Sequence, residues 1–156
     1  MTRATTTGSL MSSLIQKAAA AVGAVFLLVG VLGFIPGITQ NYDNMKFAGS
    51  SSDAELLGVF QVSVLHNIVH LLFGLAGLAL SRTWEGSRNF LIGGGLIYLL
   101  LGIYDAIVKQ DSSANFLPTN NGDTYLHLAL GVGMIALGFA LRGTRPGHER
   151  YAEARA

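Results

Sequence analysis

The sequence predicts an all-α fold, an integral membrane bundle of four helices. Only 12% of its 156 residues are charged and 51% are apolar, whereas about a quarter of the residues in an ordinary soluble domain are charged. The mean hydropathy of +0.48 agrees with this reading. Four segments contain no Asp, Glu, Lys or Arg, at residues 18–42, 56–81, 89–104 and 124–141. Because a helix crosses the hydrocarbon core of a bilayer in about 20 residues, we interpret each segment as a membrane span.

The boundaries of the spans follow from these segments and from local stop signals. The spans are expected at residues 18–38, 60–81, 89–108 and 124–142. Pro36 and Gly37 are expected to end the first span. The link between the second and third spans is short, so these helices should be antiparallel neighbours, with Trp84 at the membrane interface. Asp123 or Thr124 is the expected N-cap of the fourth span. The domain organisation is then a polar cytoplasmic tail at 1–16, a transmembrane domain at 17–142 and a basic cytoplasmic tail at 143–156.

Lysine and arginine are distributed unequally between the two sides of this bundle. The side with both termini carries Arg3, Lys17, Arg82, Arg88, Arg142, Arg145, Arg150 and Arg155. The two loops on the other side carry one lysine each, Lys46 and Lys109. Since positively charged flanks stay in the cytoplasm, we expect a multi-pass protein of the plasma membrane with both termini cytoplasmic. The first apolar run is longer than that of a signal peptide, so we interpret it as an uncleaved span.

Several classes of function are disfavoured by what the sequence lacks. It has no cysteine, which excludes disulfides and thiolate metal sites, and its net charge of +1 does not suggest a nucleic-acid surface. It shows no Ser-His-Asp spacing and no phosphate-binding loop, and "GGG" at 93–95 lies inside a span. Only one acidic residue, Asp105, touches a span, which argues against a transporter. We therefore expect a protein that is not an enzyme.

An internal similarity relates the two halves of the chain. "HLLFGLAGLAL" from His70 aligns with "HLALGVGMIAL" from His127, and "LGFIPGI" from Leu32 aligns with "LGIYDAI" from Leu101. Because each half has two spans, a duplication would give two antiparallel helix pairs related by a pseudo-twofold along the membrane normal. Short matches in apolar sequence also arise by chance, so both explanations stay open.

Small residues recur at helical spacing along each predicted span. In a membrane such stripes mark the faces on which helices pack closely. The predicted packing positions are Gly30, Gly33, Gly74, Gly77, Gly95, Gly102, Gly131 and Gly138. His70 and His127 lie four residues before two of these glycines, so both histidines should lie on the packed faces.

Polar residues are expected to gather at the extracytoplasmic end of the bundle. The predicted cluster, which could bind a ligand, contains His66, Asn67, His70, Asp105 and His127. The first interpretation is a hydrogen-bonded network in which Asp105 fixes the tautomer of a histidine, with no cofactor.

Two other interpretations of this cluster assign it a ligand. His66 and His70 have the i, i+4 spacing of a helical zinc pair, which His127 and Asp105 could complete. The glutamate of a metalloprotease is absent from "HNIVH", so such a zinc site would be structural. Alternatively, His70 and His127 on opposed helices could be the axial ligands of a haem b in an electron carrier.

The segments "HNIVHLLFGLAGL" and 115–138 carry a family resemblance. The chain resembles, over about residues 18–142, a bacterial family of four-span membrane proteins classed as a domain of unknown function. The resemblance implies the fold and a plasma-membrane location, and it supplies no catalytic residues. The function predicted from the whole sequence is a non-enzymatic accessory or stabilising bundle. Its expected partners are the lipid bilayer and other membrane subunits or further copies of itself. The alternative is a haem- or metal-binding redox protein that uses His66, His70 and His127.

Overall fold

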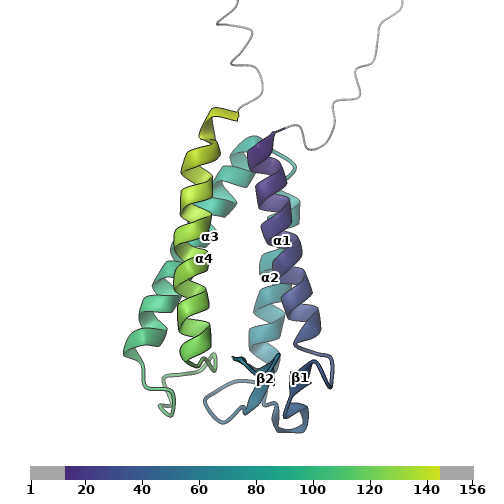
Figure 1. Cartoon of the computed structure of the whole chain (residues 1–156), viewed down its shortest axis with the longest axis vertical. Coiled ribbons are helices and arrows are strands. Elements are labelled where there is room, and N and C mark those ends of the chain that lie inside the picture. Colours follow the sequence, from purple (N-terminus) through teal and green to yellow (C-terminus); the bar gives the residue numbers. More distant parts are fainter. Residues whose placement is uncertain (1–12, 145–156) are drawn as a thin grey trace, which may run out of the picture.

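The four predicted helices are present in the structure, a computed structural model that describes residues 13–144. Their bounds are Leu14–Leu32 (α1), Val64–Leu80 (α2), Trp84–Ile107 (α3) and Asn121–Ala140 (α4). A single 3-10 turn, Leu141–Thr144, follows α4. The all-α bundle predicted from the charge-free segments is therefore confirmed (Figure 1). Most of the predicted tails, 1–16 and 143–156, lies outside the described residues.

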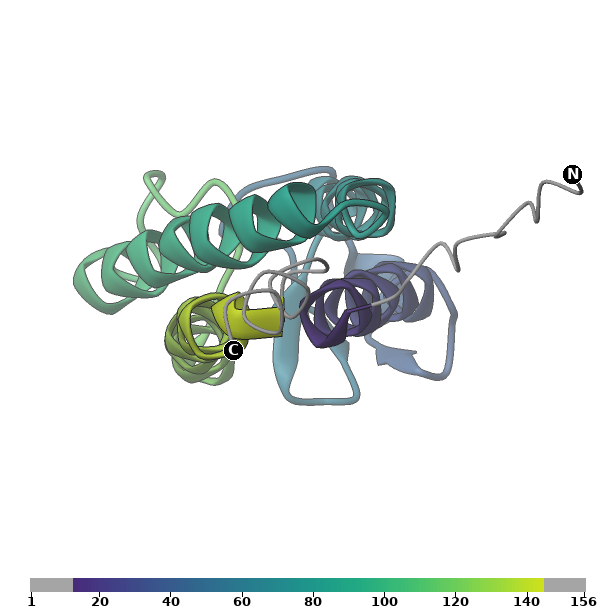
Figure 2. The same cartoon turned by 90° about the horizontal axis from the view of Figure 1, so that it is seen from above.

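The helices form two hairpins. α1 packs along α2 and α3 packs along α4, whereas contacts between the hairpins are made mainly by α1 with α3. Seen from above, α3 runs obliquely from the end of α2 to the side of α4 (Figure 2). The start of α1 and the end of α4 lie at one end of the bundle, and the strands lie at the other, which we call the sheet end (Figure 1).

Three of these helices are long and apolar enough to cross a membrane. They are α1 with 19 residues, α3 with 24 and α4 with 20. α2 is apolar but has 17 residues, which corresponds to a length of about 25 Å. It starts at Val64 rather than at residue 60, so the second predicted span is shorter than the sequence suggested.

The segment between α1 and α2 differs from the prediction because it forms a small sheet. The strands are Thr39–Gln40 (β1), Ala54–Leu56 (β2) and Phe60–Val62 (β3), antiparallel in the order β1-β2-β3, with a 3-10 turn at Tyr42–Asn44. β3 occupies the residues expected to begin the second span. The sheet buries Ala54, Leu56 and Val62 against the end of α1.

Local hydrogen bonds explain where the helices begin and end. α1 stops at Leu32, six residues before the expected end, and the Thr39 hydroxyl donates to the Leu32 carbonyl at 3.1 Å. The turn then continues through Gly37 at φ +90°, a conformation that favours glycine. α3 begins at Trp84 rather than at residue 89, because Thr83 accepts from the Gly86 amide and caps it.

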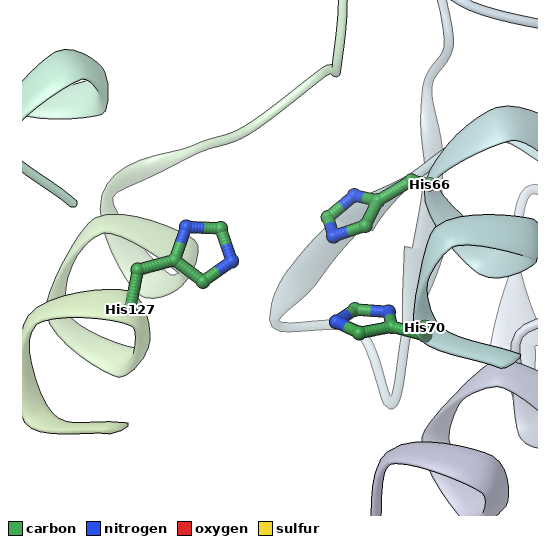
Figure 3. Close-up of side chains that lie close together, drawn as sticks. All are labelled: His66, His70 and His127. Carbon is green, nitrogen blue, oxygen red and sulfur yellow. The ribbon is translucent and has the colours of Figure 1, made fainter. Parts of the chain in front are cut away.

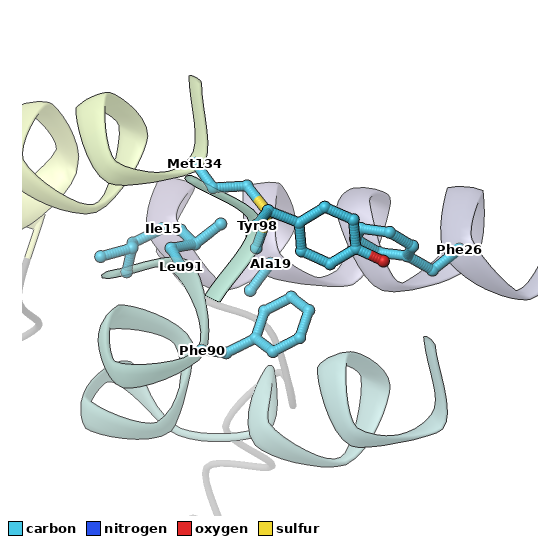
Figure 4. Close-up of a cluster of buried hydrophobic side chains, with 7 residues drawn as sticks. All are labelled: Ile15, Ala19, Phe26, Phe90, Leu91, Tyr98 and Met134. Carbon is cyan, nitrogen blue, oxygen red and sulfur yellow. The ribbon is translucent and has the colours of Figure 1, made fainter. Parts of the chain in front are cut away.

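The core lies along the axis of the bundle and is continuous with glycine contacts between the helices. Its buried side chains, drawn in Figure 4, are Ile15, Ala19, Phe26, Phe90, Leu91, Tyr98 and Met134. A Cβ on Gly74 would lie 2.7 Å from the Gly23 carbonyl oxygen, and one on Gly131 would lie 2.5 Å from the Leu99 nitrogen. A Cβ on each of the other predicted packing glycines would also lie less than 3.0 Å from an atom of a neighbouring helix; these are Gly30, Gly33, Gly77, Gly95, Gly102 and Gly138.

Candidate metal centre

Three histidine side chains converge at the sheet end of the bundle. His66 and His70 project from the first two turns of α2, and His127 projects from the second turn of α4 (Figure 3). One possible ligand atom from each ring lies within 4.8 Å of the other two, and all three residues are buried. In each ring the nitrogen farther from the Cβ, Nε2, points into the space between the two helices (Figure 3).

Helix caps hold the two histidine-bearing turns in place. Ser63 caps α2 by accepting from the amide of His66 at 3.1 Å. Asn120 and Asp123 form a capping box at the start of α4. The same Asp123 carboxylate accepts from the Gln61 amide of β3 at 2.9 Å. Because β3 leads directly into α2, this bond fixes the start of α2 relative to the start of α4.

A carboxylate orients one of the three rings. Asp105, in the last turn of α3, lies with Oδ2 2.6 Å from Nδ1 of His127, and both side chains are buried. Since a carboxylate accepts the ring hydrogen at Nδ1, the lone pair of the neutral ring is on Nε2, the nitrogen aimed at the other histidines. Thr119 donates to the other oxygen of Asp105 at 3.0 Å. Asn115 in turn donates to the Thr119 carbonyl at 3.3 Å.

Aromatic rings enclose the cluster on the side of the core. The His66 and His70 rings stack with centroids 4.6 Å apart, and Phe26 stacks with His70 at a centroid distance of 5.7 Å. Tyr98 meets His127 edge to face at 5.2 Å. These contacts restrict the rings without supplying hydrogen bonds. The ring of His70 makes no hydrogen bond within residues 13–144, and its Nδ1 is fully buried without a partner.

The space beside the histidines is small. A cavity of about 20 Å³ is bordered by His66, Asp105, Thr119 and His127. Such a volume holds about one water molecule or one ion. A porphyrin is many times larger and would have to displace the packed rings of His66 and Tyr98. The residues present therefore fit a single metal ion and do not fit haem.

The structure brings together four of the five residues predicted for the polar cluster: His66, His70, Asp105 and His127. The fifth, Asn67, is fully buried but faces α1, where its side chain contacts Met45 and the backbone position of Gly33. Asn67 follows His66 directly, and one residue turns a helix by about 100°, which separates the two side chains.

Sequence reasoning missed two residues of the site. Thr119 lies in the loop before α4, where a polar residue has no periodic pattern to give its direction, and Tyr98 lies inside α3, where an aromatic residue usually indicates only packing. The expected N-cap of α4, Asp123 or Thr124, is also corrected, because Asn120 occupies that position. The signal for this cap was present in "NNGD", in which Asn120 precedes Asp123 by three residues.

A comparison with family models identifies the family of the chain. Residues 16–140 match the model described as Domain of unknown function (DUF4383). The chain belongs to this family. The matched range includes His66, His70, Asp105 and His127, and the match confirms the resemblance to a family classed as a domain of unknown function. No curated protein and no solved structure matches the chain. The chemistry of this DUF4383 protein must therefore be inferred from its own geometry.

Proposed function

We propose that this DUF4383 protein binds one divalent transition-metal ion through His66, His70 and His127, and that this ion is zinc. The observation that carries the proposal is the convergence of three buried imidazoles whose ligand atoms lie within 4.8 Å of one another. Neutral imidazole is a preferred ligand of zinc, copper and nickel ions, and buried sites of this kind exclude competing water.

The distances are close to those of a bound site. In a tetrahedral zinc site each nitrogen is about 2.0 Å from the ion, so pairs of ligand nitrogens are about 3.3 Å apart. Closing the observed separation of up to 4.8 Å needs a shift of roughly 1.5 Å, shared between the rings of two helices. Asp105 already supports this arrangement, because metal-bound histidines commonly donate their second ring hydrogen to a carboxylate.

The His70 ring is not part of a closed hydrogen-bonded network. A buried polar group without a partner costs about 1–3 kcal/mol, so such groups are rare in folded proteins. The His70 ring has no hydrogen bond in the described part of the chain, and its Nδ1 is buried. A closed network would therefore leave out the His70 ring, whereas the Nε2 of this ring points toward the other two histidines and is placed to bind an ion (Figure 3). Its Nδ1 stays without a partner in either case.

The role proposed for the ion is to join the two hairpins, which makes the protein a stabilising bundle rather than an enzyme. His66 and His70 belong to the α1–α2 hairpin and His127 to the α3–α4 hairpin. Apart from the histidines, α2 and α4 make few contacts with each other. An ion that binds only the folded state stabilises it by about 2.7 kcal/mol when its free concentration is 100 times the dissociation constant.

Metal analysis of the purified protein tests the proposal. The protein is isolated in detergent with a histidine-free tag, loaded with zinc, desalted and analysed for zinc per chain. We expect one zinc ion in the wild type and loss of it in His66→Ala, His70→Ala and His127→Ala. His148→Ala is the matched control, because His148 is the one other histidine of the chain and lies outside the described residues. Zinc retained by the three cluster variants would contradict the proposal.

We also propose that the bundle resides in the plasma membrane with both termini in the cytoplasm. The support is the excess of Lys and Arg in the sequence around the start of α1, around the link between α2 and α3, and after α4. Fusions of a reporter that is active only in the cytoplasm should then be active at either terminus. Activity of a reporter that requires export would contradict this orientation.

A second candidate function is to pack against another membrane subunit or a second copy of the chain. The outer face of α4 presents small exposed residues at helical spacing, Ala129, Gly133, Ala136 and Ala140, and a Cβ on Gly133 would meet nothing within 4 Å. Small residues let helices approach closely in a membrane. Crosslinking in native membranes should recover one reproducible neighbour, and Gly133→Leu should weaken that crosslink. A strictly monomeric protein without a neighbour would exclude this function.

A further inference from the structure

The cavity beside the histidines borders the proposed ion on one side only. His66 and His127 form part of its wall, together with Asp105 and Thr119. Three histidines leave one position of a tetrahedral ion unfilled, and zinc sites with three protein ligands usually bind water or another small ligand there. The cavity, at about 20 Å³, has room for one such atom group.

The hydroxyl of Thr119 determines which hydrogen-bonding group this ligand needs. This hydroxyl donates its hydrogen to an oxygen, either Asp105 Oδ1 at 3.0 Å or Asn115 Oδ1 at 3.3 Å. A hydroxyl that has given its hydrogen away can only accept from a further partner. A ligand in the cavity is therefore favoured when its oxygen coordinates the ion and when it carries a hydrogen that Thr119 can accept.

An apolar groove adjoins the cavity on the outer side of α3. Leu101, Tyr104 and Phe116 border both spaces, and Ile97 and Leu100 complete the groove. The groove has a volume of about 350 Å³ and is bordered almost entirely by apolar surface. Ile97, Leu100 and Phe116 are all more than half exposed. Since α3 is long and apolar enough to cross a membrane, these residues would face the acyl chains of lipid.

We infer that the ion keeps an open coordination position that binds the headgroup of a membrane amphiphile. The headgroup has a coordinating oxygen and an O–H or N–H for Thr119, and the alkyl chain lies in the groove formed by Ile97, Leu100, Leu101, Tyr104 and Phe116. The inference rests on the proposed metal site. Such an amphiphile would occupy the cavity, the Thr119 acceptor and the adjoining groove together.

Cobalt-loaded protein in detergent tests the inference, because the visible spectrum of Co²⁺ responds to a change of ligand. The probes are acetohydroxamate and decanohydroxamate, which share a headgroup with coordinating oxygens and donor hydrogens and differ in chain length. We expect both to change the spectrum, with decanohydroxamate half-saturating at a concentration at least ten times lower. Decanoate, which has the same chain length and no hydrogen to donate, should bind more weakly than decanohydroxamate.

Two matched variants separate the groove from simple partitioning of the probe into the micelle. Leu100→Trp fills the groove, whereas Leu96→Trp lies one turn away on the same helix, outside the groove, and is exposed to a similar extent, 51% against 58%. Leu100→Trp should remove the advantage of decanohydroxamate and leave acetohydroxamate unchanged. Leu96→Trp should preserve the advantage. One cobalt per chain in both variants shows that each is folded.

Each other outcome overturns a distinct statement. If one cobalt binds and neither hydroxamate alters the spectrum, there is no open position, and the metal site itself still stands. If both tryptophan variants respond like the wild type, the chain does not lie in this groove. If decanoate binds as tightly as decanohydroxamate, Thr119 does not select the headgroup. If no cobalt binds, the proposed function fails and the inference fails with it.

Discussion

The contact between Asp105 and His127 allows the metal centre to be tested without removing a ligand. The substitution Asp105→Asn keeps the size of the side chain and removes the negative charge beside the imidazole. In the structure the two groups are 2.6 Å apart and both side chains are at most 6% exposed, so solvent does not screen the interaction. Carboxylates that orient metal-bound histidines contribute about 10–100-fold to metal affinity, which corresponds to about 1.4–2.7 kcal/mol.

The assay is a competition titration of zinc between the detergent-solubilised protein and a chromophoric chelator. We expect the dissociation constant of Asp105→Asn to be 10–100 times that of the wild type, with one ion still bound per chain at saturation. Asp111→Asn is the matched control, because Asp111 is exposed in the loop that follows α3. An Asp105→Asn protein with wild-type affinity would refute the assigned role of this carboxylate.

Three further predictions concern stability, each measured as the midpoint of thermal unfolding in detergent. Gly131→Ala should destabilise the protein by about 1–3 kcal/mol, because the new Cβ would lie 2.5 Å from the Leu99 nitrogen. Gly133→Ala, whose new Cβ would meet no atom within 4 Å, should be neutral or stabilising. Equal effects of the two substitutions would refute the packing argument. Asn120→Ala should cost about 1 kcal/mol through loss of the cap of α4, and no change would show that the capping box is dispensable. His70→Leu should leave the metal-free protein as stable as the wild type or more so, since the His70 ring lacks a hydrogen bond. The same substitution should abolish the increase in the unfolding midpoint that zinc causes in the wild type. A retained increase would contradict ligation by His70.

The membrane bundle could be predicted because its physical cause is visible in the sequence. Charges are excluded from hydrocarbon, so segments without Asp, Glu, Lys or Arg locate the helices directly. The small sheet could not be predicted in the same way. Its strands have two or three residues, too short for an alternating pattern, and β3 lies in the same segment without charged residues as α2. Tertiary packing of Leu56 and Val62 under the sheet decides the conformation of this segment.

The candidate site was predictable where helical spacing alone determines the face. His66 and His70 lie four residues apart, and His127 lies at a matching depth on α4, so their approach follows from helix geometry. Asn67 shows the limit of arguments from depth, because it lies at the right level but faces α1. Thr119 lies in a loop, where no periodicity indicates its direction, and only the structure places it against Asp105.

The central claim, that the three imidazoles hold one ion, is tested most directly by zinc K-edge X-ray absorption on the wild-type protein. The account predicts scattering from three imidazole nitrogens at about 2.0 Å with one further light atom, and loss of the imidazole signal in a variant lacking His66, His70 and His127. A spectrum without imidazole scattering, or one that is unchanged in that variant, would contradict the account.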